Sequence, residues 1–318
     1  DLRAARELYG LFRRLRPDVV HTHNPKPGWL GRPAARAARV PAGVNTVHGL
    51  YAQPTDPWAR RSVVAVLERG AAAASHAELV QNPEDVATLR SWGVPRRRLT
   101  TLGNGIDLDR FDRREAMAGE RAQLRSEWGI DDDVPVVVTV GRLVAEKGYR
   151  ELFEAHRRLR DAGSNHELVV VGPADTAKAD GLTEAELDRA TDDGVRLAGY
   201  SDRPERYYAA ADLFVLASYR EGFPRAAMEA SAMGLPVVAT DIRGCRQVVD
   251  EGRTGLLVAP RNAAALTAAL EALLGDPDRR AAMGTGAASR ARTEFDQRRQ
   301  IDITLATYRR LLPDRSPC

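Results

Sequence analysis

Two glutamates separated by seven residues, Glu221 and Glu229, have the type and placement to accept hydrogen bonds from ligand hydroxyl groups. The apolar run 213–217 predicts a buried strand before them, and Pro224 suits the first position of the helix that follows. Glu221 then lies in the turn and Glu229 on the second helical turn. Because backbone N–H groups at a helix start favour an anion, a ligand with hydroxyls at both ends and a diphosphate between them fits here. The alternative is two solvated glutamates at a helix end.

Two basic side chains follow another predicted strand, 136–140. Gly141 and Arg142 come directly after this strand, and Lys147 stands at the end of a short polar turn. An arginine offers bidentate donors and a lysine a compact charge, which together suit a diphosphate leaving group. Ligands bind beyond the carboxyl ends of parallel strands, so we expect these cations at the same site as the glutamates.

Polar side chains also stand at strand ends early in the chain. The first predicted strand ends at His23, followed by Asn24, and the second ends at His48. His48 is a candidate to contact a substrate hydroxyl or phosphate, and a hydrogen-bonded core histidine is the alternative. His21 and His23 share a strand face, but the sequence places no third ligand, so packing is favoured and no metal site is predicted.

Three other patterns are rejected as sites. Asp131–Asp133 has the spacing of a metal-binding acidic pair, but it lies in a polar stretch before a strand and is interpreted as a solvated turn. The G-x-G at 284–286 has no preceding strand and lacks a third glycine, which excludes a dinucleotide fingerprint. The arginines at 96–98 have no aromatic neighbours, so no nucleic-acid partner is predicted.

Strands alternate with helices along the chain, which predicts parallel sheets with helices on both faces. The predicted strands are 19–23, 44–48, 78–81, 134–140, 168–171, 195–197, 213–217, 237–240 and 255–258. An Asn-Gly turn at 104–105 and the charge-rich stretch after it mark a domain boundary. We therefore expect a first domain at 1–107, a linker at 108–133, a second domain at 134–299 and a final helix at 300–318.

Composition restricts the class of protein. The 318 residues suffice for two domains, and no apolar run reaches the length of about eighteen residues that crosses a membrane. The two cysteines, Cys245 and Cys318, form no disulfide framework, which favours a reducing compartment. Residues 1–104 carry 16 Lys and Arg against 8 Asp and Glu. This excess predicts contact with an anionic membrane surface or a phosphorylated acceptor, with solvated arginines on helix faces as the alternative.

Taken in order, these segments resemble the retaining glycosyltransferases of the GT-B fold, in the bacterial group known as group 1 or family 4. The resemblance covers nearly the whole chain. The matching segments are His21-Thr22-His23-Asn24-Pro25, Asn104-Gly105-Ile106-Asp107, Gly141-Arg142-Leu143, Glu146-Lys147-Gly148, Asp212-Leu213-Phe214-Val215-Leu216, Glu221-Gly222-Phe223-Pro224 with Glu229, and Gly234-Leu235-Pro236-Val237-Val238-Ala239-Thr240. Their order and spacing make the match specific.

The resemblance implies two Rossmann-like domains facing across a cleft, with a nucleotide sugar held mainly by the second. The implied donor-binding residues are Gly141, Arg142, Lys147, Glu221, Gly222, Phe223, Pro224 and Glu229. Among these, Glu221 would bind the sugar hydroxyls and Glu229 the ribose. The implied catalytic residues are His48, Glu221, Arg142 and Lys147, and the acceptor side carries His23, Asn24 and Lys26. No metal and no cofactor beyond the donor are expected.

The family's first strand and glycine-rich turn have no counterpart here, because the chain begins within an amphipathic helix that carries Leu8, Leu11 and Phe12 on one side. We therefore expect an N-terminally truncated chain with an incomplete first domain and an exposed sheet edge. We also expect this fragment to be poorly active or inactive, while its full-length parent is an enzyme.

The expected reaction transfers a glycosyl group from a nucleoside diphosphate sugar, UDP-linked by the habits of the group, to a glycan or lipid-linked acceptor with retention of anomeric configuration. The expected location is cytoplasmic, with peripheral attachment to the inner membrane face. The alternatives are a GT-B epimerase or phosphorylase and a non-catalytic sugar-nucleotide-binding protein.

Overall fold

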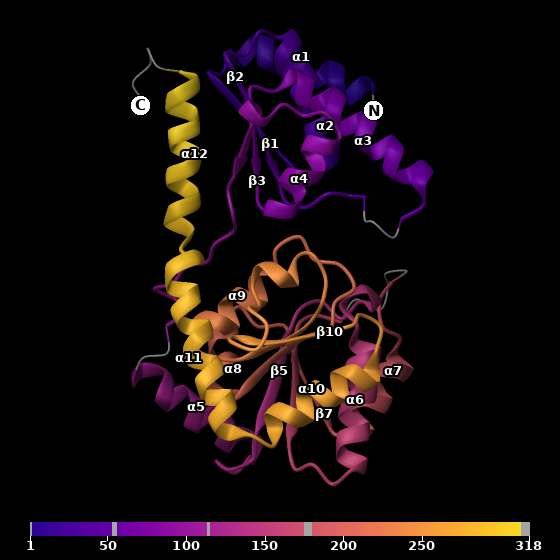
Figure 1. The fold of residues 1–318 in the computed structure, drawn as a ribbon, viewed down its shortest axis with the longest axis vertical. Helices are drawn as coiled ribbons and strands as arrows, with labels where there is room; N and C mark the ends of the chain where they lie inside the picture. Colours follow the sequence, from indigo (N-terminus) through magenta and orange to yellow (C-terminus); the bar gives the residue numbers. More distant parts are fainter. Residues whose placement is uncertain (1, 53–55, 113–114, 175–179, 313–318) are drawn as a thin grey trace. The chain divides into compact units, whose positions relative to one another are not determined.

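The computed structural model describes residues 2–52, 56–112, 115–174 and 180–312, with side chains described from 119 onward in the third range. The chain forms two compact units. Unit 1 comprises residues 1–104 and 297–318, and unit 2 comprises residues 105–296. Each unit contains one parallel sheet with helices packed on it (Figure 1). The predicted α/β class with two parallel-sheet domains is thus confirmed.

The sheet of unit 1 has the strand order β1-β2-β3-β4, so β1 forms one edge. Its elements before the crossing to unit 2 are α1 (Leu2–Leu15), β1 (Val19–His23), α2 (Pro25–Ala37), β2 (Ala42–Val47), α3 (Trp58–Ala74), β3 (Ala77–Val80), α4 (Pro83–Ser91), the short 3-10 helix η1 (Arg96–Arg98) and β4 (Leu99–Thr101). The sequence pattern missed β4, because it has only three residues and is half-buried.

The last helix of the chain, α12 (Gln297–Leu311), is part of unit 1. Ile303, Tyr308 and Leu311 pack against a buried cluster that contains Val44 and Leu79 of the sheet. The helix starts three residues before the predicted position, and residues 313–318 of the predicted helix lie outside the described part of the chain.

A buried ionic network joins α2, α3 and the sheet of unit 1. The Arg32 guanidinium lies 3.0 Å from Glu78 and 2.9 Å from Glu68, and its side chain is almost fully buried. Asn45 donates to the second oxygen of Glu78 and Trp29 donates to Glu68. Burial raises the pKa of Glu78, and the charge of Arg32 opposes that rise. One buried cation therefore holds two buried carboxylates, and removing it would leave both uncompensated.

Unit 2 has a six-stranded parallel sheet in the order β10-β9-β8-β5-β6-β7. Its elements are α5 (Glu115–Trp128), β5 (Val136–Val140), η2 (Ala145–Lys147), α6 (Tyr149–Asp161), β6 (Glu167–Val171), α7 (Glu184–Asp192), β7 (Val195–Gly199), α8 (Pro204–Ala210), β8 (Leu213–Leu216), α9 (Arg225–Ala232), β9 (Val237–Thr240), η3 (Cys245–Gln247), β10 (Gly255–Val258), α10 (Ala263–Leu274) and α11 (Pro277–Glu294). Along β5, Val136 and Val138 enter one core cluster and Val137 enters another, so the sheet is covered on both faces.

The stretch 108–133, predicted to be a linker, is instead an integral part of unit 2. It contains α5, where the Arg125 guanidinium is buried and donates to the carbonyls of Ala210 and Val134. Arg121 and Arg125 both pair with Asp212 at the C-terminal end of α8. A cation beside the last carbonyls of a helix is stabilised by the helix dipole, which explains why a polar segment packs firmly here.

Candidate functional site

Lys147 and Glu221 form an ion pair at the carboxyl edge of the sheet of unit 2. The Lys147 Nζ lies 2.6 Å from Glu221 Oε1, and both side chains are largely buried. Ser218 Oγ donates to the same carboxylate oxygen at 2.8 Å. The pair forms because Lys147 follows β5 and Glu221 follows β8, and these strands are parallel neighbours.

Glycine makes this close approach possible. Gly148 has a φ of 70°, and a Cβ at this position would lie 2.0 Å from the carbonyl oxygen of Ala217. The backbone N–H of Tyr219 donates to the carbonyl of Glu146 at 2.8 Å, which ties the segment after β8 to η2. A side chain at position 148 would therefore clash with the backbone of Ala217, at the start of the segment that carries Glu221.

The two other residues predicted after β5 have different surroundings. The Gly141 carbonyl accepts from the Tyr149 hydroxyl at 2.9 Å, and the backbone of Gly172 packs so close that a Cβ there would lie 1.9 Å from it. Arg142 is exposed, and within the described ranges its guanidinium has no hydrogen bond or ion pair. The structure therefore brings Lys147 to Glu221, while in the described part of the chain Arg142 makes no hydrogen bond or ion pair with either glutamate.

The turn after Glu221 is held from two sides. Phe223 packs edge-on against Phe295 with ring centroids 6.1 Å apart. Gly244 contacts the main chain of Glu221, since a Cβ at Gly244 would lie 2.5 Å from the Glu221 carbonyl oxygen. Pro224 is the N-cap of α9 with a ψ of 111°, so the helix starts at Arg225 and not at Pro224 as predicted. The predicted donor-binding residues Gly222, Phe223 and Pro224 thus line the entry to α9.

Glu229 contacts neither Lys147 nor Glu221 among its hydrogen bonds and ion pairs in the described ranges. Its carboxylate accepts from the Tyr208 hydroxyl at 3.0 Å, and the Arg225 Nε lies 4.0 Å away. Burial raises the pKa of Glu229, and the Tyr208 hydroxyl and Arg225 oppose that rise. The sequence pattern missed Tyr208, because a tyrosine in α8 gives no signal of a partner in α9.

In unit 1 the structure joins two of the predicted histidines. His23 Nδ1 lies 2.9 Å from His48 Nε2, at the ends of the neighbouring strands β1 and β2. Packing around the rings lowers the pKa of both, the charge of His48 lowers that of His23 further, and a hydrogen bond with Gln81 partly restores that of His48. Both imidazoles are therefore mainly neutral near neutral pH and can each donate and accept one hydrogen bond.

His21 extends this pair into a row of three rings. It stacks on His23 with centroids 4.3 Å apart, contacts Thr46 at 2.8 Å and contacts the hydroxyl of Tyr308 in α12 at 2.5 Å. Burial, together with His23 and His48, lowers the pKa of His21 to about 4. The i,i+2 histidines thus form a packed imidazole row. Nowhere in the described ranges are three or more His, Cys, Asp and Glu side chains grouped so that they could hold a metal ion.

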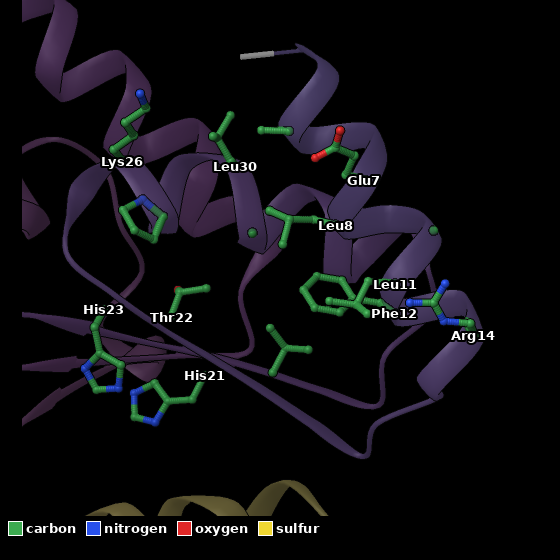
Figure 2. A pocket seen from close by; sticks show the side chains of 15 residues that line it. Glu7, Leu8, Leu11, Phe12, Arg14, His21, Thr22, His23, Lys26 and Leu30 are labelled. Carbon is green, nitrogen blue, oxygen red and sulfur yellow. The ribbon is translucent and has the colours of Figure 1, made fainter.

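An apolar cavity of about 1140 Å³ adjoins this row, between α1, β1 and α2 (Figure 2). Leu8, Leu11, Phe12 and Leu30 line it, and His21 and His23 lie at one side. Lys26, predicted on the acceptor side, stands on the first turn of α2 and its ammonium group points away from the imidazoles in Figure 2. Asn24 forms the turn between β1 and α2 with a φ of 69°.

The two units present different polar groups at the carboxyl edges of their sheets. Unit 2 places a lysine, a carboxylate and the entry to a helix at one sheet edge, which suits a ligand with both phosphate and hydroxyl groups. Unit 1 places neutral imidazoles at its own carboxyl edge, which suits hydrogen bonding to uncharged hydroxyls. None of the helices that the structure describes is both long and apolar enough to cross a bilayer.

The chain matches two families and many individual proteins. The family described as glycosyl transferases group 1 matches residues 120–290, and glycosyltransferase family 4 matches residues 1–110. D-inositol 3-phosphate glycosyltransferase of Nocardia farcinica is 32% identical over 309 residues, covering 90% of this chain and 64% of its own length. The Escherichia coli UDP-Gal:alpha-D-GlcNAc-diphosphoundecaprenol alpha-1,3-galactosyltransferase is 29% identical over 266 residues, covering 81% and 66%.

The fold comparison agrees with the sequence comparison. The solved structure of sucrose-phosphate synthase from Thermosynechococcus elongatus superimposes with a TM-score of 0.80 at 26% identity, covering 98% of this chain and 78% of that one. The chain therefore spans about two thirds to four fifths of the length of these relatives. With a family match over more than half of its residues, the chain belongs to the group 1 glycosyl transferases and has their GT-B fold.

Proposed function

We propose that this protein transfers a glycosyl group from a nucleoside diphosphate sugar to a hydroxyl of a glycan or lipid-linked acceptor, with retention of anomeric configuration. The observation that carries this proposal is the ion pair of Lys147 with Glu221 beside the entry to α9. The donor nucleotide we propose is a uridine diphosphate, as in the name of the Escherichia coli relative.

In this proposal unit 2 holds the donor. The Lys147 ammonium and the Arg142 guanidinium neutralise the diphosphate, and the exposed, unpaired Arg142 is available to turn toward it. Glu221 accepts hydrogen bonds from sugar hydroxyls, and Glu229 accepts from the ribose. The backbone from Gly222 to Pro224 supports the phosphates and sugar.

The bond between the anomeric carbon and the diphosphate oxygen breaks, and a bond from the acceptor oxygen to the same face forms. The departing phosphate oxygen takes the acceptor proton, so no nucleophilic side chain is needed. Fixed positive charge stabilises the leaving diphosphate, which is often the largest catalytic contribution. His48, mainly neutral near pH 7, hydrogen-bonds a sugar hydroxyl, with His23 holding its ring.

On the acceptor side we propose His23, Asn24 and Lys26, at the carboxyl edge of unit 1. We also propose that the protein works at the inner face of the membrane. Its support is the charge of unit 1, which has 21 Lys and Arg against 10 Asp and Glu. The Escherichia coli relative acts, by its name, on a diphosphoundecaprenol-linked sugar.

The test replaces Lys147 by Met and measures release of uridine diphosphate from a panel of donors with and without acceptor. We expect turnover to fall by about a hundredfold or more, by analogy with the loss of one oxyanion donor. Arg150→Met is the matched control, because Arg150 is an exposed cation three residues away that pairs with Glu186. Wild-type turnover in Lys147→Met would refute the assignment, and conversion of the donor to an isomer without acceptor would indicate an epimerase.

A further inference from the structure

Helix α3 carries an unusual concentration of exposed apolar side chains. Trp58, Val66, Val63 and Leu67 have 79%, 71%, 60% and 41% of their surface exposed. No other helix among the described residues has as many large hydrophobic side chains in this state. In Figure 1, the first turns of α3 extend away from the sheet of unit 1. Scattered single exposures are normal in proteins, but Val63, Val66 and Leu67 are spaced by three and four residues and so share one side of the helix, with Trp58 exposed in the first turn.

The inward face of α3 is clearly defined. Val64, Glu68, Ala71 and Ala72 are buried at the three- and four-residue spacing of a helix face packed on its neighbours. Glu68 is the single acidic residue between 58 and 74, and its carboxylate binds Arg32 and Trp29 inside unit 1. The outward face of α3 therefore carries apolar groups and no carboxylate.

The charges on the outward side are all positive. Arg60 and Arg69 are exposed on the two flanks of the arc formed by Val63 and Val66. Arg61 is exposed in the first turn of the helix, on the side of Val64. Arg60 lies 3.5 Å from Asp56, one turn before it, which is an exposed and weak ion pair. Long arginine stems can lie along apolar surface while their guanidinium groups reach the phosphate level of a bilayer. An apolar stripe flanked by arginines is the pattern of a helix that lies in a membrane interface.

The composition of this helix surface favours a lipid bilayer over a second copy of the chain as its binding partner. A second copy of the chain, packed on the same patch by a two-fold axis, would bring arginines of one copy against arginines of the other. The cores of protein interfaces are also depleted in charged residues. An anionic lipid surface, by contrast, attracts all three arginines and takes up the apolar side chains at the boundary of headgroups and acyl chains.

We propose that the α3 surface, made of Trp58, Val63, Val66, Leu67, Arg60, Arg61 and Arg69, binds the headgroup region of an anionic phospholipid bilayer. This inference deepens the membrane part of the proposed function and does not depend on the donor site. The helix begins ten residues after His48 along the chain, so docking it would anchor the carboxyl edge of unit 1 near the lipid surface.

The test is flotation of the protein with phosphatidylglycerol-containing vesicles and with pure phosphatidylcholine vesicles. We expect binding to the anionic vesicles only, with a blue shift of Trp58 fluorescence that disappears in Trp58→Phe. Arg60→Gln/Arg61→Gln should weaken binding about tenfold or more. Val63→Asp/Val66→Asp should weaken it at least as much, and because both valines are exposed the fold should be retained, as circular dichroism checks.

Arg96→Gln/Arg97→Gln is the matched control, since these exposed arginines of η1 belong to the same unit but have no apolar neighbours of this kind. Equal loss of binding in this control and in the α3 variants would overturn the proposal in favour of general charge attraction. A wild-type protein that fails to float, or one that dimerises through α3 in sedimentation velocity, would also overturn it. Titration of the protein with uridine diphosphate reports on the proposed donor site in unit 2. A protein that binds uridine diphosphate but not vesicles would therefore overturn the membrane proposal and leave the donor site standing.

Discussion

Replacing Gly244 by Ala tests whether the position of Glu221 controls the reaction. Gly244 has φ −70° and ψ −41°, which alanine adopts without strain, so any effect must come from contact. The new Cβ would lie 2.5 Å from the Glu221 carbonyl oxygen and 2.8 Å from its Cβ. Ordinary carbon contacts are about 3.5 Å, so the Glu221 segment must move by about 0.7–1.0 Å.

We expect this shift to cost about 1–3 kcal/mol of unfolding free energy, as for other overpacked sites. A misplacement of about 1 Å near the chemistry can cost about a hundredfold in rate, so kcat/KM should fall by a similar factor. The assay combines urea unfolding with the rate of nucleotide release at saturating acceptor. The loss should appear in kcat/KM for the donor even at temperatures where the variant is fully folded.

Gly286→Ala is the control that separates position from stability. Its Cβ would lie 2.7 Å from the Arg253 carbonyl oxygen, so it also meets a backbone oxygen at less than contact distance. That contact precedes β10, on the sheet edge opposite to the one where Glu221 follows β8. We expect a similar loss of stability with unchanged kcat/KM. If Gly244→Ala unfolds more easily but transfers sugar like the wild type, the assigned role of Glu221 is wrong.

Three further predictions concern buried polar groups. Arg32→Met should lower the unfolding free energy by about 3–5 kcal/mol, measured in urea, because two buried glutamates lose their cation. Burial and the neighbouring His156 lower the pKa of His166 to about 4. The contribution of neutral His166 to the unfolding free energy is therefore full above pH 6.5 and is lost as the pH falls toward 4. We expect His166 to account for a loss of about 2 kcal/mol of unfolding free energy at pH 5, and this share should be absent in His166→Phe. Tyr208→Phe removes the hydroxyl that stabilises the Glu229 carboxylate, so the acid limb of donor binding should move to higher pH in calorimetric titrations.

Local patterns were sufficient for the parallel α/β class of both sheets, although they missed β4. Short β-branched runs such as 136–140, separated by amphipathic helices, leave a parallel sheet covered on both faces as the available packing. The meeting of Lys147 and Glu221 was also predictable in outline, because residues just beyond parallel strands share one edge. The lack of an ion pair between Arg142 and either glutamate was not predictable, since a long exposed side chain has many rotamers of similar energy.

Contacts between distant segments escaped the sequence analysis. Tyr308 reaches His21 across 287 residues, and no local signal in α12 indicates this partner. The stretch 108–133 was misread because its charged residues were taken to be solvated, while Arg125 in fact uses its charge to satisfy buried carbonyls. Gly244 gave no signal either, because only the neighbouring Glu221 backbone makes a side chain there intolerable.

The placement of α12 in unit 1 has a consequence for biosynthesis. A ribosome synthesises all of unit 2 before it makes the residues of α12 that complete the core around Val44 and Leu79. The core of unit 1 therefore stays incomplete until α12 has been made, even though most of unit 1 is synthesised before unit 2. Released chains truncated after residue 296 should show a protease-resistant unit 2 and a protease-sensitive unit 1, because the core around Val44 and Leu79 then lacks α12.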